Sequence, residues 1–558
     1  MKHLRPISFI ILLATSLFHP AKAQTTAATS PQPAVTQATP RLVVGLVVDQ
    51  MRWDYLYRYA DRYGQGGFKR LLREGFSAAN CQINYMPTVT AAGHASVYTG
   101  TTPSVHGIAG NKFRNGNRWQ YCTEDTTVSA VGSQGAAGRM SPRNMLATTM
   151  GDELKLATNF RSRVIGVALK DRAAILPAGH LADAAYWFDD EAGCFITSSF
   201  YRQELPQWAA AFNAQKWPDR LLTEKWQTLY PIETYTQSTA DDAPYEEPFV
   251  DYGRTTFPYD LQALRDSLGY GLLRAVPQGI QLTFAMARAA LIGEGLGHGS
   301  QTDMLCVSIS PTDYIGHQFG INSIEVEDAY LRLDKELEAF LNFLDREVGQ
   351  GAYLFFLTAD HGAAHNIDFN RDHRIPSEPW HMSATTRELN DWLKAHYHAD
   401  ENLLFGDRNC QIHLAHETIA RLGIDEAELR RLAVDHLKTD LRFAYVADID
   451  DIAASPIPQL IRERAINGYH RERSGCLLTI PRPAIYGDSR TTGLTGSMHG
   501  VWNPYDNHIP CVFFGQGISH GETAREVHIT DIAPTVCALL HIQMPNGCIG
   551  QPIEGVVK

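Results

Sequence analysis

The sequence has no excess of basic residues. Its 558 residues include 49 Lys and Arg against 61 Asp and Glu, which gives a formal charge of −12 at pH 7. Binding to nucleic-acid polymers or anionic membranes relies on basic surface, so this composition argues against broad binding of either kind. A site can still be locally positive on an acidic protein. Small anionic ligands therefore remain possible partners.

Closely spaced Cys-x-x-Cys motifs and long apolar runs are also lacking. The nine cysteines form no Cys-x-x-Cys motif, so a cysteine-based zinc site has no support, and their odd number leaves at least one thiol unpaired in a monomer. After the N-terminal segment, no apolar stretch reaches the ~20 residues that span a bilayer. We expect no stable membrane anchor. The oligomeric state stays open, with a monomer as one plausible state.

The first 23 residues are typical of a secretory signal peptide. Two basic residues precede an apolar run over 7–18, and an A-x-A cleavage site ends at Ala23. We expect cleavage after Ala23 and a periplasmic or secreted product. Residues 24–40 are rich in Thr, Ala, Gln and Pro and have little to bury, so they are predicted to form a flexible linker.

Short apolar runs recur along the rest of the chain, as is typical of buried parallel strands. Helical periodicity is clearest over 324–348. Strands that alternate with helices predict an α/β fold whose central, largely parallel sheet is flanked by helices. The predicted strands are 42–48, 164–169, 304–309, 353–357 and 509–514.

Two stretches, at about 186–259 and 375–495, interrupt the alternation of strands and helices. We expect them to be insertions that cover the active site. Polar residues of functional type recur from residue 49 to residue 499, so one sheet is expected to gather them. Residues 41–558 are therefore predicted to form a single catalytic domain.

Side chains of metal-ligand type stand beside four of the predicted strands. An Asp after a strand is usually a helix cap or turn residue, but the combination of all four places in one chain points to a shared site. Ligands bind at the carboxyl ends of strands in such sheets, and carboxylate with imidazole suits zinc or another borderline divalent ion. The candidates are Asp49, Asp313, His317, Asp360, His361 and His499.

A candidate nucleophile lies in the segment 86–94, MPTVTAAGH. The small residues after Thr90 would let the backbone approach a substrate closely. A threonine hydroxyl is a poor nucleophile unless a base or a metal ion activates it. Local reasoning does not choose between Thr88 and Thr90, and both could be ordinary turn or strand residues.

Three further polar residues could bind an anion. Asn111 lies in a glycine-punctuated loop, where its amide could donate to a substrate oxygen or simply cap a turn. Lys170 and Arg172 follow a predicted strand. In extended backbone, residues two apart face the same side, so both charges could bind one anion. A solvated pair is the alternative.

Together these residues resemble the alkaline phosphatase superfamily, and in particular the PafA-type periplasmic alkaline phosphatases, which are related to the nucleotide pyrophosphatase/phosphodiesterases. The matching blocks keep their order and span nearly the whole chain after the signal peptide. They are VVDQMRWDY, MPTVTAAGHASVYTGTTPSVHGIAGN, LKDRAAILPAGH, PTDYIGHQFG, LTADHG and GSMHG.

The resemblance implies an alkaline phosphatase-like fold and an exported enzyme with two zinc ions. It implies that small phosphate monoesters are hydrolysed through a phosphothreonine intermediate on Thr90 rather than on Thr88. The implied roles are one zinc on Asp313, His317 and His499, a second zinc on Asp49, Asp360, His361 and Thr90, and phosphoryl oxygens on Asn111, Lys170 and Arg172.

Charge favours monoesters within this resemblance. Two zinc ions, three aspartates and a threonine alkoxide are about neutral by formal count, and Lys170 with Arg172 brings the site to about +2. That charge suits a monoester dianion better than the monoanion of a diester, so a phosphodiesterase/nucleotide pyrophosphatase is the alternative.

Two other functions have less support from the sequence. A sulfatase would need a Cys/Ser-x-Pro-x-Arg motif, and residues 101–105, TTPSV, lack both its first residue and its arginine. A non-catalytic binding protein with a structural metal has no need for Thr90. It remains a less favoured alternative.

Overall fold

The computed structural model describes residues 39–116, 118–407, 409–487 and 494–557. The predicted signal peptide and the linker up to residue 38 lie outside the described residues. Thr39–Lys558 forms one compact unit. Within the ranges described, no helix is both long enough and apolar enough to cross a membrane.

An 11-stranded sheet organises the fold, with strand order β19-β2-β20-β12-β1-β11-β6-β7-β8-β5 and β21 paired to β2. Its middle is parallel, and its flanks are antiparallel except that β21 pairs with β2 in parallel. The bounds of three of these strands are β5 (Ala130–Val131), β8 (Cys194–Ser198) and β21 (Gly521–His528). The middle strands are fully buried runs, as expected where helices cover both faces of a sheet. The five parallel strands are β12 (Tyr353–Thr358), β1 (Leu42–Val48), β11 (Asp303–Ile309), β6 (Val164–Ala168) and β7 (Ala184–Asp189).

The predicted α/β class is confirmed, and the first four predicted strands are confirmed to within one residue. The prediction of a parallel strand over 509–514 was wrong. This segment forms β19 (His508–Ile509) and β20 (Cys511–Gly515), and β20 runs antiparallel to β12. An apolar run indicates burial but does not encode the direction in which a strand enters a sheet.

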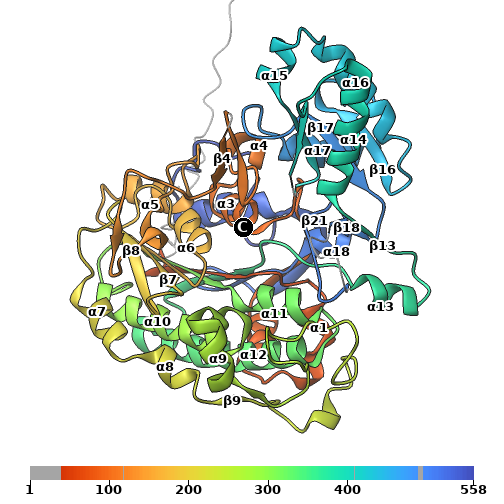
Figure 1. Cartoon of the computed structure of the whole chain (residues 1–558). Coiled ribbons are helices and arrows are strands. Elements are labelled where there is room, and N and C mark those ends of the chain that lie inside the picture. The colour runs from red at the N-terminus through yellow and green to blue at the C-terminus, as the bar shows by residue number, and fades with distance from the viewer. Residues whose placement is uncertain (1–38, 117, 408, 488–493, 558) are drawn as a thin grey trace, which may run out of the picture. The chain divides into compact units, whose positions relative to one another are not determined.

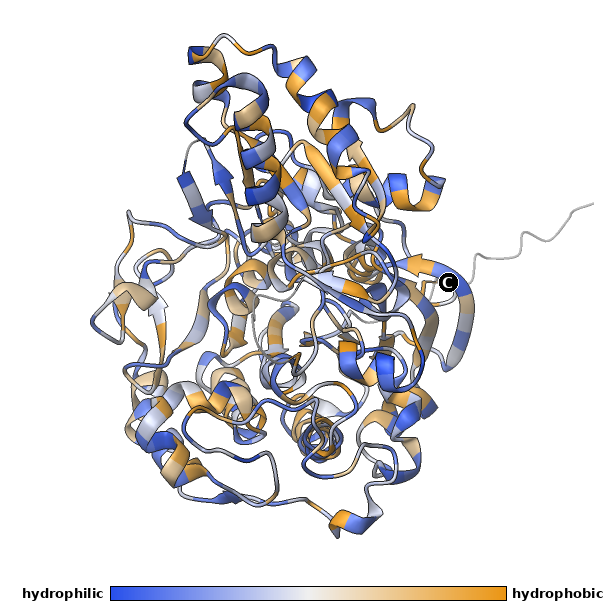
Figure 2. Cartoon of the chain, turned by 45° about the vertical axis from the view of Figure 1, so that its right-hand side comes forward, coloured by the Kyte–Doolittle hydropathy of each residue, from blue (hydrophilic) through white to orange (hydrophobic). Residues whose placement is uncertain are grey.

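Two groups of helices pack against the sheet. The predicted helix over 324–348 is α12 (Ile324–Leu344), which continues as a short π-helical turn; the Ser323 side chain caps its first turn by accepting from the Val326 N–H. In Figure 1, α10 and α12 lie on one side of the sheet and α3 and α6 on the other. Alternating orange and blue bands along helices in Figure 2 reflect their half-buried faces. The other bounds are α10 (Gln278–Glu294), α3 (Thr90–Thr99) and α6 (Asp171–Ala178).

A smaller antiparallel sheet lies within the stretch 375–495, in the order β14-β15-β17-β16. It has its own hydrophobic cluster, and Figure 1 shows α14, α16 and α17 gathered around it. The other stretch, 186–259, begins inside β7 of the central sheet. The bounds are β14 (Leu404–Gly406), β15 (Gln411–Leu414), β16 (Phe443–Asp448), β17 (Leu477–Pro481), α14 (Met382–Tyr397), α16 (Glu426–Leu437) and α17 (Gln459–Gly468).

Strand order determines where the polar residues meet. Because β12, β1, β11 and β6 are parallel neighbours, the residues that follow them share one edge of the sheet. β2 (Phe76–Gln82) is antiparallel to β20 and so runs in the direction of β12. The segment that leads from β2 into α3 therefore leaves the sheet at the same edge.

Candidate active site

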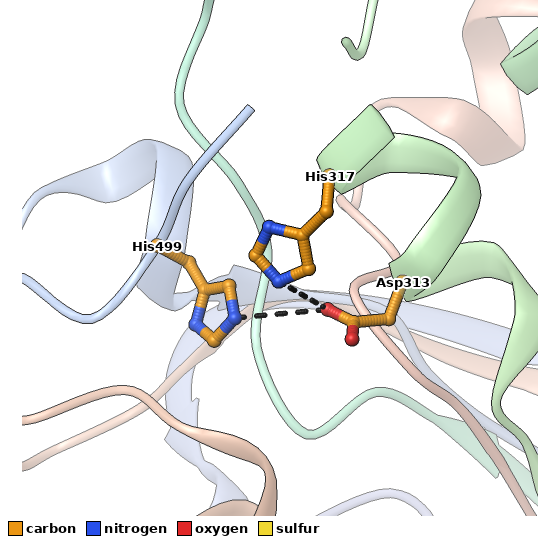
Figure 3. A group of neighbouring side chains, drawn as sticks. All are labelled: Asp313, His317 and His499. Carbon is orange, nitrogen blue, oxygen red and sulfur yellow. Dashed lines mark ion pairs between the residues drawn. The ribbon is translucent and has the colours of Figure 1, made fainter. Parts of the chain in front are cut away.

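Asp313, His317 and His499 form one group of potential metal ligands. Asp313 and His317 lie one turn apart on α11 (Pro311–Phe319) and face the same way, while His499 comes from a separate loop (Figure 3). The Nε2 atoms of His317 and His499 lie 3.2 Å and 3.6 Å from Asp313 Oδ1. Three donor atoms from two segments thus converge.

Backbone carbonyls orient these two imidazoles. Nδ1 of His317 lies 2.7 Å from the Ser497 carbonyl oxygen, and Nδ1 of His499 lies 2.8 Å from the Thr88 carbonyl oxygen. A carbonyl can only accept, so each Nδ1 carries the proton. In the neutral ring, Nε2 then keeps a lone pair directed at the group, which is the arrangement of metal-binding histidines.

Asp49, Asp360 and His361 form the second group, and all three are fully buried. His361 Nε2 lies 3.5 Å from Asp49 Oδ1 and 3.5 Å from Asp360 Oδ2. These three atoms have no hydrogen-bond partner among the described residues. Buried polar atoms are normally paired, so three such atoms facing one point fit a cation.

The two groups lie side by side, because the rings of His361 and His499 stack with their centroids 3.6 Å apart. Burial lowers the pKa of both imidazoles, which keeps them neutral, the form that binds metals. One group offers two nitrogens and one carboxylate, and the other offers two carboxylates and one nitrogen. Both donor sets fit zinc or a similar divalent ion.

Lys170 lies between the two groups. Its Nζ donates to Asp49 Oδ2 and to Asp313 Oδ2, both at 2.6 Å. Burial alone would lower the pKa of Lys170, but the carboxylates of Asp313 and Asp49 outweigh it and raise the pKa. The residue is therefore a buried cation shared by both groups, and the alternative of a solvated charge does not hold.

Arg172 has a different environment. Its Nη1 donates to the Tyr121 hydroxyl at 2.9 Å, and its buried Nε has no partner among the described residues. The expectation of extended backbone through this pair was wrong for Arg172: Lys170 is extended at the N-cap position of α6, but Arg172 already lies in the first turn of that helix. Strand β6 ends two residues before Lys170, and the helix begins at once.

The structure separates the two candidate threonines. The Thr88 hydroxyl donates to the Val501 carbonyl at 2.9 Å and also contacts Asp506 Oδ2 at 3.3 Å. Thr90 is the first residue of α3 and is 1% exposed, and its hydroxyl makes no hydrogen bond to any described residue. The Thr88 hydroxyl is therefore used in hydrogen bonds that stabilise the fold, whereas the Thr90 hydroxyl is available to a ligand.

Helix α3 is held against the second ligand group. A Cβ at position 93 would lie 2.4 Å from the Asp360 carbonyl oxygen, so glycine permits this close approach. His94, one turn after Thr90, has Nδ1 3.3 Å from Asp360 Oδ2 and Nε2 2.8 Å from Ser308 Oγ. Sequence reasoning gave no role to His94, although its spacing from Thr90 places both on one helix face.

Asn111 completes the surroundings of Thr90. Its Oδ1 accepts the Ala91 N–H of the first turn of α3 at 2.9 Å. The amide oxygen is thereby used, and the side-chain NH₂ is left to donate elsewhere. Asn111 can therefore cap the first turn of α3 through its Oδ1 and still bind an anion through its NH₂ group.

Comparison with known proteins identifies the family. The model of the type I phosphodiesterase / nucleotide pyrophosphatase family matches residues 43–502. The chain belongs to this family. The match runs through all of the site elements described above, from β1 to the loop that carries His499.

Individual family members agree with this assignment. The chain is 49% identical to a protein of Myroides odoratus named calcium-transporting ATPase, over 93% of this chain and 95% of that one. It is 47% identical to alkaline phosphatase PhoV of Synechococcus elongatus, over 94% and 95%. The crystal structure of alkaline phosphatase PafA has a TM-score of 0.91 and 46% identity, covering 93% of this chain and 99% of that one. The resemblance to PafA-type alkaline phosphatases is confirmed.

Proposed function

We propose that this phosphatase is an exported, two-zinc phosphomonoesterase that hydrolyses small phosphate monoesters through a phosphothreonine intermediate on Thr90. The main support is the set of three buried atoms of Asp49, Asp360 and His361 that have no hydrogen-bond partner among the described residues. They lie beside a second ligand group, and α3 is packed against Asp360 through Gly93.

Each ion would be held by one ligand group. One would be bound by Asp313, His317 and His499, and the other by Asp49, Asp360, His361 and Thr90. Two divalent ions held in this way supply Lewis-acid stabilisation of the attacking and leaving oxygens of a phosphoryl transfer.

The chain's own residues would carry out the following steps. Thr90 Oγ gives up its proton and attacks phosphorus in line, and the ester oxygen leaves with the electron pair of its bond to phosphorus and takes up a proton as the alcohol. Water then attacks phosphorus and breaks the Oγ–P bond, so that the water oxygen leaves with the phosphate and a proton from water restores the Thr90 hydroxyl. The Asn111 NH₂ and the Arg172 guanidinium donate to phosphoryl oxygens. Because the transition state is loose, positioning and charge supply most of the catalysis.

Known relatives support these assignments. The names of PhoV and PafA describe alkaline phosphatases. A second crystal structure of PafA carries replacements of one threonine, one asparagine, one lysine and one arginine. The threonine and asparagine have the same separation as Thr90 and Asn111, and the lysine and arginine the same as Lys170 and Arg172.

The family description also names phosphodiesterases, so diester hydrolysis is the second candidate. The two cations at positions 170 and 172 favour a monoester, because a diester carries one negative charge fewer. Metal analysis combined with a phosphate-release panel of monoester, diester, phosphonate and sulfate ester tests the proposal. We expect two zinc ions per chain and a clear preference for the monoester. A strong preference for the diester contradicts it.

Thr90→Ala separates catalysis from binding. We expect this variant to retain zinc and lose turnover, whereas a non-catalytic metal-binding protein would be indifferent to the change. Export has its own test, because N-terminal sequencing of the exported protein should begin at Gln24. Retention of the uncleaved chain would contradict the predicted signal peptide.

A further inference from the structure

Gln50 contacts one carboxylate of each ligand group. Its backbone N–H donates to Asp360 Oδ1 at 3.1 Å, and its side-chain Nε2 donates to Asp313 Oδ1 at 2.8 Å. Gln50 directly follows Asp49 and is 3% exposed. One residue therefore touches both groups and adjoins a third ligand.

The backbone of Gln50 adopts a left-handed conformation that allows both contacts. Its φ is +64°, in the left-handed region, which costs a residue with a Cβ about 1 kcal/mol. The turn after β1 directs the N–H toward Asp360 while the side chain reaches α11. An unfavourable backbone conformation held in place by hydrogen bonds to two proposed ligands points to a role at the site.

Helix α11 makes room for this side chain. A Cβ at position 316 would lie 1.9 Å from Gln50 Oε1, so only glycine fits there without displacing the amide. Gly316 lies between Asp313 and His317 on the same helix. The amide also has one sensible orientation, because Oε1 facing the Asp313 carboxylate would repel it, whereas Nε2 donates.

We propose that Gln50 is a positioning residue for the metal pair, in which the backbone holds Asp360 and the side chain fixes the carboxylate of Asp313. The inference rests on the proposed two-zinc function. It predicts that a change of the Gln50 side chain affects the zinc affinity of the two ligand groups unequally. Replacing the side chain removes the contact with Asp313 but keeps the N–H donor to Asp360, so only the group of Asp313, His317 and His499 should lose affinity.

Chelator competition on the purified protein measures both zinc affinities without using activity. We expect Gln50→Met to weaken one zinc about 10- to 100-fold, the usual effect of removing a partner of a metal ligand, and to leave the other within about threefold. Gly316→Ala, which displaces the Gln50 amide, should act in the same direction and provides a second route if Gln50→Met folds poorly.

Two further variants identify the affected site and control for general damage. In His499→Ala, the weaker zinc should be the one that Gln50→Met weakens, and combining both changes should cost less than the sum of their separate effects. Gln411→Met is the matched control. Gln411 is 3% exposed and accepts the Gly475 N–H in the smaller sheet, and we expect both zinc affinities to be unchanged.

The outcomes are distinct. Equal weakening of both sites in Gln50→Met, or no change at either, would overturn the positioning role while leaving the two-zinc enzyme intact. A wild-type protein that binds fewer than two zinc ions would instead contradict the proposed function itself.

Discussion

Arg172→Ala offers the cleanest test of monoester preference. The guanidinium donates to the Tyr121 hydroxyl, and among the described residues its buried Nε has no hydrogen-bond partner and no carboxylate forms an ion pair with it. Lys170 is less suitable, because its removal leaves Asp49 and Asp313 without their shared cation. Changing Arg172 therefore removes positive charge from the substrate side without unbalancing the ligand groups.

The expected size follows from the lost contacts. Removing one preorganised donor from a developing anion typically costs about 10²–10³ in kcat, or about 2.7–4 kcal/mol. We expect kcat/KM for an aryl phosphate monoester to fall by this factor in Arg172→Ala. A diester has one negative charge fewer, so its kcat/KM should fall less than about tenfold.

Two controls accompany this measurement. Arg172→Lys keeps the charge and should lose less than Arg172→Ala. Tyr121→Phe removes the hydroxyl that accepts from Arg172 but keeps the guanidinium, so its effect on the monoester should also be smaller. If Arg172→Ala lowers monoester and diester activity by the same factor, the charge argument for monoesters is refuted.

Two other predictions concern stability. Thr88→Val should destabilise the protein by about 1–3 kcal/mol in urea unfolding, because the buried Val501 carbonyl loses its donor. Its kcat/KM should change much less than that of Thr90→Val. Equal losses of activity in the two variants would contradict this prediction. Burial raises the pKa of Glu246 to about 9 and that of Glu325 to about 8. At intermediate pH the folded state therefore keeps protons that the unfolded chain has lost. The free energy of unfolding should fall as pH rises from about 5 to 9, by up to ~1.4 kcal/mol per group and pH unit. Glu246→Gln with Glu325→Gln should flatten that decline, and a parallel decline in wild type and variant would contradict it.

The sequence predicted the sheet well because its middle strands are continuous apolar runs. All seven residues of β1 are buried, so the run 42–48 and the strand coincide. The direction of β20 could not be predicted in this way, because it depends on which neighbour the strand meets. The conformation of Arg172 was also misjudged, since α6 begins directly after the extended Lys170.

The candidate site was partly predictable for a related reason. Parallel strands place their carboxyl ends at one edge, so the ligand types that follow β1, β11 and β12 were expected together. Gln50 was overlooked because glutamine is not a usual metal ligand. Its role depends on a left-handed backbone and on space at Gly316, and the contact with that distant glycine cannot be read from local sequence.

The most direct test of the central claim is acid quenching of the enzyme during turnover of a ³²P-labelled phosphate monoester, followed by peptide mapping. The account predicts label on Thr90, absent in Thr90→Ala and retained in the matched control Thr88→Val. Label on Thr88 or on another residue, or steady turnover in Thr90→Ala, would contradict it.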